Sequence, residues 1–167
     1  MSAQCYLDSP VGRLLLRSDG PSLTGVHFPC SRDTFAHSPD AVTDHSDPLL
    51  RTACEQLSEY FAGHRQVFAL PLLAHGSDFQ RRVWAELSRI PFGETISYGE
   101  LALRLGDKGA ARAVGLANNR NPIPIVIACH RVIGADGSLV GFGGGLARKQ
   151  WLLRHEATLI TDRFELR

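Results

Sequence analysis

The stretch IPIVIACHRVIGADG, residues 123–137, constrains both the fold and the function of this chain. Four of the five residues from Ile123 to Ile127 are apolar, which predicts a buried strand. The run leads directly into Cys129 and His130, and the turn-like GADG follows. A cysteine after a buried strand is most often an inert core thiol. The adjacent imidazole supports a second interpretation, in which the thiol is a nucleophile.

The surroundings of Cys129 favour this chemical interpretation. An imidazole, directly or through a water, can take the proton from a thiol, and only the thiolate is a good nucleophile. Three asparagines precede the cysteine, and the glycine-rich segment GFGGG follows it, which leaves room for a planar ligand against the backbone. A third group usually orients the base, and Glu156 is the candidate. By chemistry alone, a thiol hydrolase of the Cys-His-acid type remains an alternative.

Two helices joined by a short glycine-containing turn are predicted upstream of the cysteine. Ser97 and Glu100 have the spacing of a capping box and open a helix that ends near Gly106, after which GAARAVGLAN begins another helix. This order is that of a helix-turn-helix, with two packed helices as the alternative. The second helix is rich in small residues, which allow close approach by a neighbouring helix or by a nucleic-acid groove. Arg112 stands among them, and an arginine there can fill the gap that a displaced base leaves.

The first half of the chain reads as a small sheet with one helix. Short apolar runs separated by turn residues predict strands. Asp47 followed by proline predicts the start of a helix that ends at Gly63, and QVFALPL (residues 66–72) is consistent with a further strand. In the second half, Ser77 and Gln80 form another capping box.

Charge also divides the chain. Residues 1–76 carry 5 basic and 8 acidic side chains, whereas residues 77–167 carry 13 basic and 9 acidic ones. This asymmetry indicates that the second half meets an anion. The sequence therefore predicts an α+β protein, with a sheet-plus-helix N-terminal domain over 1–76 and a helical C-terminal domain over 77–167 that carries the helix-turn-helix candidate.

Composition bounds the class of protein. The 167 residues are 44% hydrophobic and 21% charged, which is ordinary for a soluble globular protein. No apolar run approaches the roughly 20 residues that span a bilayer, and the N-terminus lacks the pattern of a secretory signal, so we expect a cytoplasmic protein, or a nuclear one in a eukaryote. The four dispersed cysteines are expected to be free thiols. A metal site built from Cys5, His27, Cys30 and His75 is a weak alternative.

Three segments in order are similar to one known family: FGETISYGELALRLG (92–106), GAARAVGLANNRNPIPIVIACHRVIGADG (109–137) and GFGGGLARKQWLLRHE (141–156). They resemble the O6-alkylguanine-DNA alkyltransferases, the DNA repair proteins also called methylated-DNA–protein-cysteine methyltransferases. The resemblance is specific over residues 77–157, and LDSPVGRL and LSEYFAG fit the family's N-terminal domain. It implies a ribonuclease-H-like fold for that domain.

The resemblance assigns a chemical role to five residues. Cys129 matches the alkyl acceptor, whose thiolate attacks the alkyl carbon on O6 of guanine. His130 matches the base that deprotonates the thiol through a water, and Glu156 matches the group that orients His130. Tyr98 matches a tyrosine that presses on the target phosphate and donates a proton to the departing guanine. Asn121 matches the residue that fixes the active-site loop.

Further residues are implied in DNA binding and in the pocket. Arg112 matches the finger that takes the place of the flipped base. The small residues expected along the minor groove are Ala110, Ala111 and Gly115. The residues expected around the guanine are Val132, Phe142, Gly143 and Lys149. Three positions depart from the usual family pattern: Ala128 replaces a proline, Phe142 a tyrosine and Gly143 a serine.

The implied activity is a single-turnover transfer of the alkyl group from O6-alkylguanine, with O4-alkylthymine left open as a second substrate. The expected partner is duplex DNA that carries the lesion, without a membrane. We expect a monomer in solution, with cooperative assembly on DNA as an open alternative. No cofactor is expected, and no zinc, because Asp19 and Thr24 stand where ligands of some members would be. Two further alternatives are a lesion sensor that binds without reacting and a DNA-binding regulator with a structural thiol.

Overall fold

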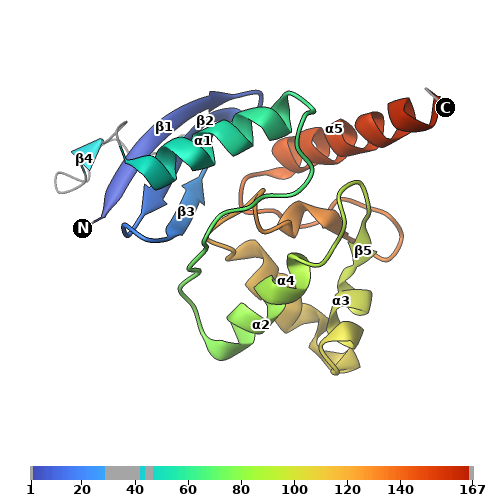
Figure 1. Cartoon of the computed structure of the whole chain (residues 1–167). Coiled ribbons are helices and arrows are strands. Elements are labelled where there is room, and N and C mark those ends of the chain that lie inside the picture. Colours follow the sequence, from blue (N-terminus) through green and yellow to red (C-terminus); the bar gives the residue numbers. More distant parts are fainter. Residues whose placement is uncertain (1, 29–41, 44–46, 166–167) are drawn as a thin grey trace. The chain divides into compact units, whose positions relative to one another are not determined.

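The computed structural model describes residues 2–28, 42–43 and 47–165 (Figure 1). It divides into two compact units, Met1–His75 and Gly76–Arg167. Strands are concentrated in the first unit and helices in the second. The α+β class predicted from the sequence is thus confirmed.

The N-terminal unit is a four-stranded sheet with one helix against it (Figure 1). The strand order is β3-β2-β1-β4, and all neighbours are antiparallel except β1 and β4, which are parallel. The helix packs against the first three strands. The elements are β1 (Ala3–Ser9), β2 (Gly12–Ser18), β3 (Leu23–His27), β4 (Val42–Thr43) and α1 (Pro48–Phe61).

Local sequence signals account for the helix of this unit. The Asp47 side chain accepts a hydrogen bond from Leu50 N, and Pro48 follows at the first helical position, where its missing N–H costs nothing. Gly63, just beyond the helix, has φ +83°, a conformation that glycine adopts without strain. The helix predicted from Asp47 to Gly63 is therefore confirmed.

The further strand expected over residues 66–72 is wrong. The described chain forms only an isolated parallel bridge there, between Leu23 and Leu72. The physical reason is a side-chain amide: Gln56 on α1 donates to Ala69 O at 3.1 Å and accepts from Ala69 N at 2.9 Å. This pair of bonds satisfies the backbone that a neighbouring strand would otherwise satisfy.

The C-terminal unit is mostly helical (Figure 1). Two short strands pair in parallel, and one of the helices, Tyr98–Arg104, packs against both of them. Its elements are α2 (Asp78–Leu87), β5 (Ile96–Ser97), α3 (Tyr98–Arg104), a 3₁₀ turn (Lys108–Ala110), α4 (Ala111–Asn119), a second 3₁₀ turn (Cys129–Arg131), β6 (Val132–Ile133) and α5 (Leu146–Glu165).

The two expected capping boxes differ in their completeness. At the start of α2 both reciprocal bonds between Ser77 and Gln80 are present. At the start of α3 the Ser97 hydroxyl accepts from Glu100 N, but the Glu100 carboxylate pairs with Arg104 one turn later. The second box is therefore half formed, and α3 begins where the sequence predicts.

The helix-turn-helix expected from the sequence is present. α3 and α4 pack against each other, and the 3₁₀ turn Lys108–Ala110 lies between them in the chain. Trp84 of α2 donates its indole N–H to Ala117 O at 2.9 Å, which ties α4 to α2. The buried side of α4 thus has helix neighbours, whereas Arg112 and Leu116 on the same helix are exposed.

Candidate active site

The segment before the cysteine is buried but is not a strand. Ile123, Ile125 and Ile127 are each at most 4% exposed, as the apolar run predicts. An isolated bridge between Pro124 and Ile127 is the sole pairing within the segment, so the predicted strand is wrong. Proline lacks an N–H and cannot join a strand ladder, which explains the outcome.

Two asparagines hold this loop and the backbone of the cysteine. Asn121 donates from Nδ2 to Ile127 O at 2.8 Å and accepts at Oδ1 from Ile123 N at 3.0 Å, so it clamps both ends of the loop. Asn118, at the end of α4, donates to Cys129 O at 3.3 Å. Asn118 was not among the predicted site residues, although the run of asparagines before the cysteine is a visible signal.

The same loop contains a strained residue. Ile125 has φ +74°, a left-handed conformation that is rare for a β-branched side chain and costs about 1–2 kcal/mol. Ala128 has φ −80°, within the range that a proline ring imposes. The backbone that the family's usual proline would fix is therefore adopted here by alanine.

Cys129 opens the 3₁₀ turn and is 3% exposed. Burial raises the pKa of its thiol to about 11, while the Asn121 side chain and the charge of Lys149 act in the opposite direction. The thiol is therefore protonated at neutral pH in the free protein. It needs a base to become a nucleophile.

His130 is fully buried beside the thiol in the chain, and it is arranged as a base. Its Nε2 lies 2.6 Å from Glu156 Oε2. Glu156 is ionised, so Nε2 carries the proton and donates it to the carboxylate, which leaves Nδ1 as an acceptor. Nδ1 has no hydrogen-bond partner among the described residues. Burial lowers the pKa of His130 despite the neighbouring carboxylate, so the ring is neutral and able to accept a proton at pH 7.

Glu156 of α5 is the centre of a buried network. Its carboxylate accepts from Arg131 Nε at 2.8 Å, from Arg131 Nη2 at 3.2 Å and from Gly93 N at 3.0 Å, in addition to His130. Arg131 also donates to Ile90 O at 2.6 Å. Burial acts to raise the pKa of Glu156, but the bonds from His130 and Arg131 outweigh it and hold that pKa well below its usual range. Arg131 was missed as a site residue because its role depends on a partner 25 positions away.

This network predicts a loss of stability in acid. The folded pKa of Glu156 lies below its ordinary 4.5, so below pH 4.5 the unfolded chain takes up a proton that the folded chain does not. The stabilisation is present above pH 4.5 and is lost as the pH falls toward the folded pKa. Burial lowers the pKa of His130 from 6.5, so proton uptake by the unfolded chain also reduces stability below pH 6.5. Urea unfolding between pH 7 and pH 3 measures the slope, which Glu156→Gln should reduce and the exposed Glu100→Gln should leave unchanged. Equal slopes in all three proteins would contradict the assignment.

Lys149 and Tyr98 form the other wall of the site. Lys149 is fully buried and donates to Val132 O at 2.6 Å, Val140 O at 3.1 Å and Gly141 O at 3.2 Å. Burial lowers the pKa of Lys149 to about 8. The Tyr98 hydroxyl donates to Val140 O at 2.7 Å and lies 3.5 Å from Lys149 Nζ. Burial, with a contribution from the Cys129 charge, raises the pKa of Tyr98.

The backbone comes close to one position that departs from the family pattern. A side chain at position 143 would begin 3.0 Å from Asn119 O, so Gly143 fits a place where the backbone comes close. Phe142 beside it is half-buried, and Gly143 is exposed. The predicted pocket residues Val132, Phe142, Gly143 and Lys149 thus all lie on or against the strand and loop that follow the cysteine.

The small residues of α4 and of the turn before it have different surroundings. Gly115 lies next to Tyr98: a Cβ added there would stand 3.8 Å from the Tyr98 ring, in ordinary contact. Ala110 and Ala111 are half-buried, and Arg112 is exposed. Of the predicted DNA-facing residues, Ala111, Arg112 and Gly115 therefore lie on α4, which reaches the wall of the site at Gly115, whereas Ala110 ends the preceding 3₁₀ turn and Tyr98 opens α3.

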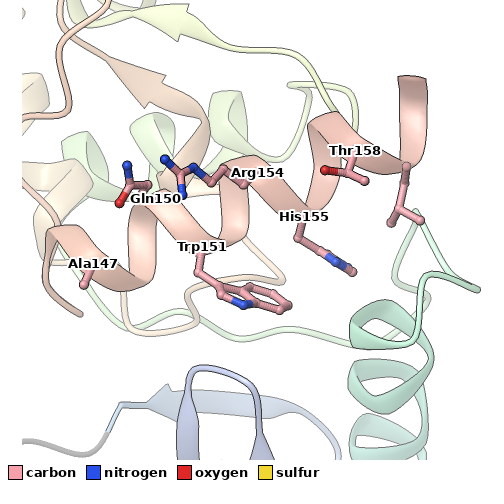
Figure 2. Close-up of a pocket in the computed structure, with 7 residues that line it drawn as sticks. Ala147, Gln150, Trp151, Arg154, His155 and Thr158 are labelled. Carbon is pink, nitrogen blue, oxygen red and sulfur yellow. The ribbon is translucent and has the colours of Figure 1, made fainter. Parts of the chain in front are cut away.

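One hollow of the surface lies apart from the predicted site residues. Seven residues of α5 line a hollow, in which the Trp151 and His155 rings stack at 4.8 Å, and no predicted site residue is among them (Figure 2). Within the described ranges, no group of three His, Cys, Asp or Glu side chains is placed to hold a metal ion. Of the residues in the alternative metal site, Cys5 has its Sγ 3.3 Å from Cys54 Sγ, and Cys30 is outside the described residues. No described helix has the length and apolarity to cross a membrane.

The fold and the site together define a class: a protein with a buried thiol that is followed in the chain by a histidine hydrogen-bonded to a carboxylate, next to a helix-turn-helix. Two family profiles match the chain. One is the ribonuclease-like domain of 6-O-methylguanine DNA methyltransferase, over residues 4–74, and the other is the DNA binding domain of the same enzyme, over residues 78–158.

Individual relatives agree with the profiles. A methylated-DNA–protein-cysteine methyltransferase of Mycolicibacterium paratuberculosis is 49% identical over 164 residues, covering 93% of this chain and 94% of the relative. One from Methanosarcina acetivorans is 44% identical, covering 90% and 96%. The crystal structure of Mycobacterium tuberculosis O6-methylguanine methyltransferase is 45% identical with a TM-score of 0.87, covering 95% and 94%. A structure of the Mycobacterium tuberculosis protein in complex with DNA has a TM-score of 0.85 at 45% identity, covering 94% of both chains.

The chain belongs to the 6-O-methylguanine DNA methyltransferase family. The family expected from the sequence is thereby confirmed.

Proposed function

We propose that this protein repairs O6-alkylguanine in duplex DNA by moving the alkyl group irreversibly to Cys129. The observation that carries the proposal is the buried series Cys129, His130 and Glu156, in which the free Nδ1 of His130 faces no protein partner among the described residues. A water at Nδ1 would relay the thiol proton to the ring, and the carboxylate would stabilise the resulting imidazolium.

The displacement balances without a cofactor. The Cys129 thiolate attacks the alkyl carbon, an S–C bond forms, and the C–O6 bond breaks with its electron pair leaving on guanine. Tyr98 gives a proton to the departing base, so that it leaves as a neutral purine, and Lys149 lies within reach to restore that proton. Nothing in this series can displace an alkyl group from a thioether, so each chain reacts once.

The lesion must leave the duplex to reach a thiol that is 3% exposed. We propose that α4 enters the minor groove, that Ala110, Ala111 and Gly115 line the face that meets the groove, and that Arg112 fills the gap in the stack. Sequence-independent binding suits a lesion that can occur in any DNA sequence. Cys129, Val132 and Gly143 would contact the guanine edge through their backbone, with Phe142 as an apolar wall.

Further parts of the proposal concern partners and domains. Every step uses residues of one chain, so the protein acts as a monomer, and cooperative assembly on DNA is not required. The site residues all come from the C-terminal unit, so residues 1–76 would serve a structural role and residues 77–167 the chemistry. The protein would act wherever the cell's DNA lies, which is the cytoplasm in a prokaryote.

Intact-protein mass spectrometry after mixing with a duplex that carries one O6-methylguanine tests the proposal. We expect one methyl group per chain, located on the Cys129 peptide, and a duplex restored to guanine. An unmodified protein that still shifts the damaged duplex in a gel would favour a lesion sensor. An unmodified protein that ignores the duplex would contradict both.

Arg112→Ala is expected to slow transfer from the duplex about 10²-fold more than transfer from the free base O6-methylguanine, because only the duplex reaction requires extrusion of a stacked base at a cost of a few kcal/mol. Single-turnover rates with both substrates measure the difference. Arg120→Ala removes an exposed cation from the end of the same helix and is the matched control. Equal slowing with both substrates would overturn the role of Arg112.

A further inference from the structure

A pair of thiols in the N-terminal unit is unused by the repair chemistry. Cys5 on β1 and Cys54 on α1 have their sulfur atoms 3.3 Å apart, although they are 49 positions apart in the sequence. Cys5 is 2% exposed, and Cys54 is intermediate. Both elements pack directly against each other (Figure 1). A disulfide has an S–S distance of about 2.05 Å, so the two sulfur atoms, 3.3 Å apart, need to approach by only about 1.2 Å to form one.

We propose that Cys5 and Cys54 form an oxidisable dithiol, which a peroxide converts into a disulfide that links β1 to α1. The reaction needs one accessible thiolate and a second thiol beside it, and the two cysteines differ in this way. The more accessible one, Cys54, receives a hydrogen bond from Cys5, which lowers its pKa and favours its thiolate. The same contact, with burial, raises the pKa of Cys5, which keeps its proton.

The reaction proceeds in two balanced steps. The Cys54 thiolate attacks hydrogen peroxide, the O–O bond breaks, and Cys54 becomes a sulfenic acid while hydroxide leaves and takes a proton to become water. The Cys5 sulfur then attacks the Cys54 sulfur, the S–O bond breaks, and a second water leaves. Two thiols lose two electrons and two protons, and one peroxide becomes two waters.

The alkyl acceptor has the opposite properties. Cys129 is 3% exposed, and burial raises its pKa to about 11, so little thiolate is available to a peroxide at neutral pH. The dithiol should therefore be oxidised before the acceptor is. The proposal assigns the two sites different chemistry in one chain: a thiol pair that responds to oxidant and a thiol reserved for the alkyl group.

The experiment titrates the reduced full-length protein with hydrogen peroxide at pH 7.5, blocks the remaining thiols under denaturing conditions and maps the peptides. We expect a Cys5–Cys54 linked peptide to appear at a peroxide dose at least tenfold below that which modifies Cys129, and dithiothreitol to reverse it. Cys30→Ser should give the same linked peptide. Cys54→Ser should give none.

Three outcomes would overturn the proposal. One is modification of Cys129 at or below the dose that links Cys5 to Cys54. Another is a linked peptide that joins Cys30 to either thiol in place of the Cys5–Cys54 peptide. The third is oxidation of the pair to separate sulfinic acids without any linked peptide. The wild-type map alone distinguishes these outcomes, so the test does not depend on the folding of a variant.

Discussion

Cys129→Ala is expected to abolish alkyl transfer and to leave the affinity for duplex DNA within about twofold. The side chain is 3% exposed, so it contributes almost no surface to a DNA complex, and its removal should affect the chemistry alone. Without the sulfur no S–C bond can form, and the neighbouring imidazole cannot replace it because His130 is fully buried and bound to Glu156. The measurement is the fraction of O6-methylguanine that remains in an oligonucleotide after incubation with excess protein.

Cys54→Ala is the matched control for this variant. It removes a free cysteine that lies in the other unit, and it should leave one alkyl group transferred per chain. Loss of transfer in Cys54→Ala, or any transfer in Cys129→Ala, would contradict the assignment of the acceptor. Duplex affinity measured in the same samples separates a chemical defect from a binding defect.

Glu156→Gln is expected to lower the free energy of unfolding by about 3–5 kcal/mol, because it leaves the buried Arg131 guanidinium without a counter-charge. Arg131 is 7% exposed, and it cannot turn to solvent without breaking its bond to Ile90 O. Urea unfolding at pH 7 gives the difference. The control is Glu100→Gln, which breaks a solvent-exposed i,i+4 pair with Arg104 and should cost less than about 0.5 kcal/mol.

A double variant separates the lost pair from general damage. In Arg131→Met/Glu156→Gln both charges are absent, so no charge is buried alone, and the protein should be more stable than Glu156→Gln. If the loss of stability in the double variant equals the sum of the losses in Arg131→Met and Glu156→Gln, each measured against the wild type, the two side chains act independently, and the interpretation of the network is wrong.

The parts of the fold that were predictable from the sequence are those with local causes. The helix starts at Asp47, Ser77 and Ser97 depend on a side chain and a backbone N–H three residues apart, and all three are where the sequence predicts. The two strands that were predicted wrongly depend on a contact with a distant residue or on a missing backbone N–H. In the segment 66–72 the backbone of Ala69 is hydrogen-bonded to the side-chain amide of Gln56. In the segment 123–127 proline has no N–H to donate to a neighbouring strand.

The candidate site shows the same division. The adjacency of Cys129 and His130 is visible in the sequence, and the asparagines before them are visible as a group. The contact between His130 and Glu156 joins residues 26 positions apart, so the residues alone offered Glu156 as a candidate, and the family resemblance paired it with His130. Arg131 follows His130 in the quoted segment, but the sequence assigned it no role, because its partners lie on α5 and at Ile90.

The convergence on Glu156 has a consequence for variant surveys. One carboxylate fastens α5 to the turn that bears the nucleophile and to the backbone at Gly93. A loss of a few kcal/mol changes how much protein a cell retains. Survival of alkylation-treated cells carrying substitutions at Glu156 or Arg131 would therefore report abundance together with chemistry, whereas Cys129→Ala would report chemistry alone. The survival measured for variants at these positions becomes interpretable once it is divided by the amount of the variant protein that the same cells contain.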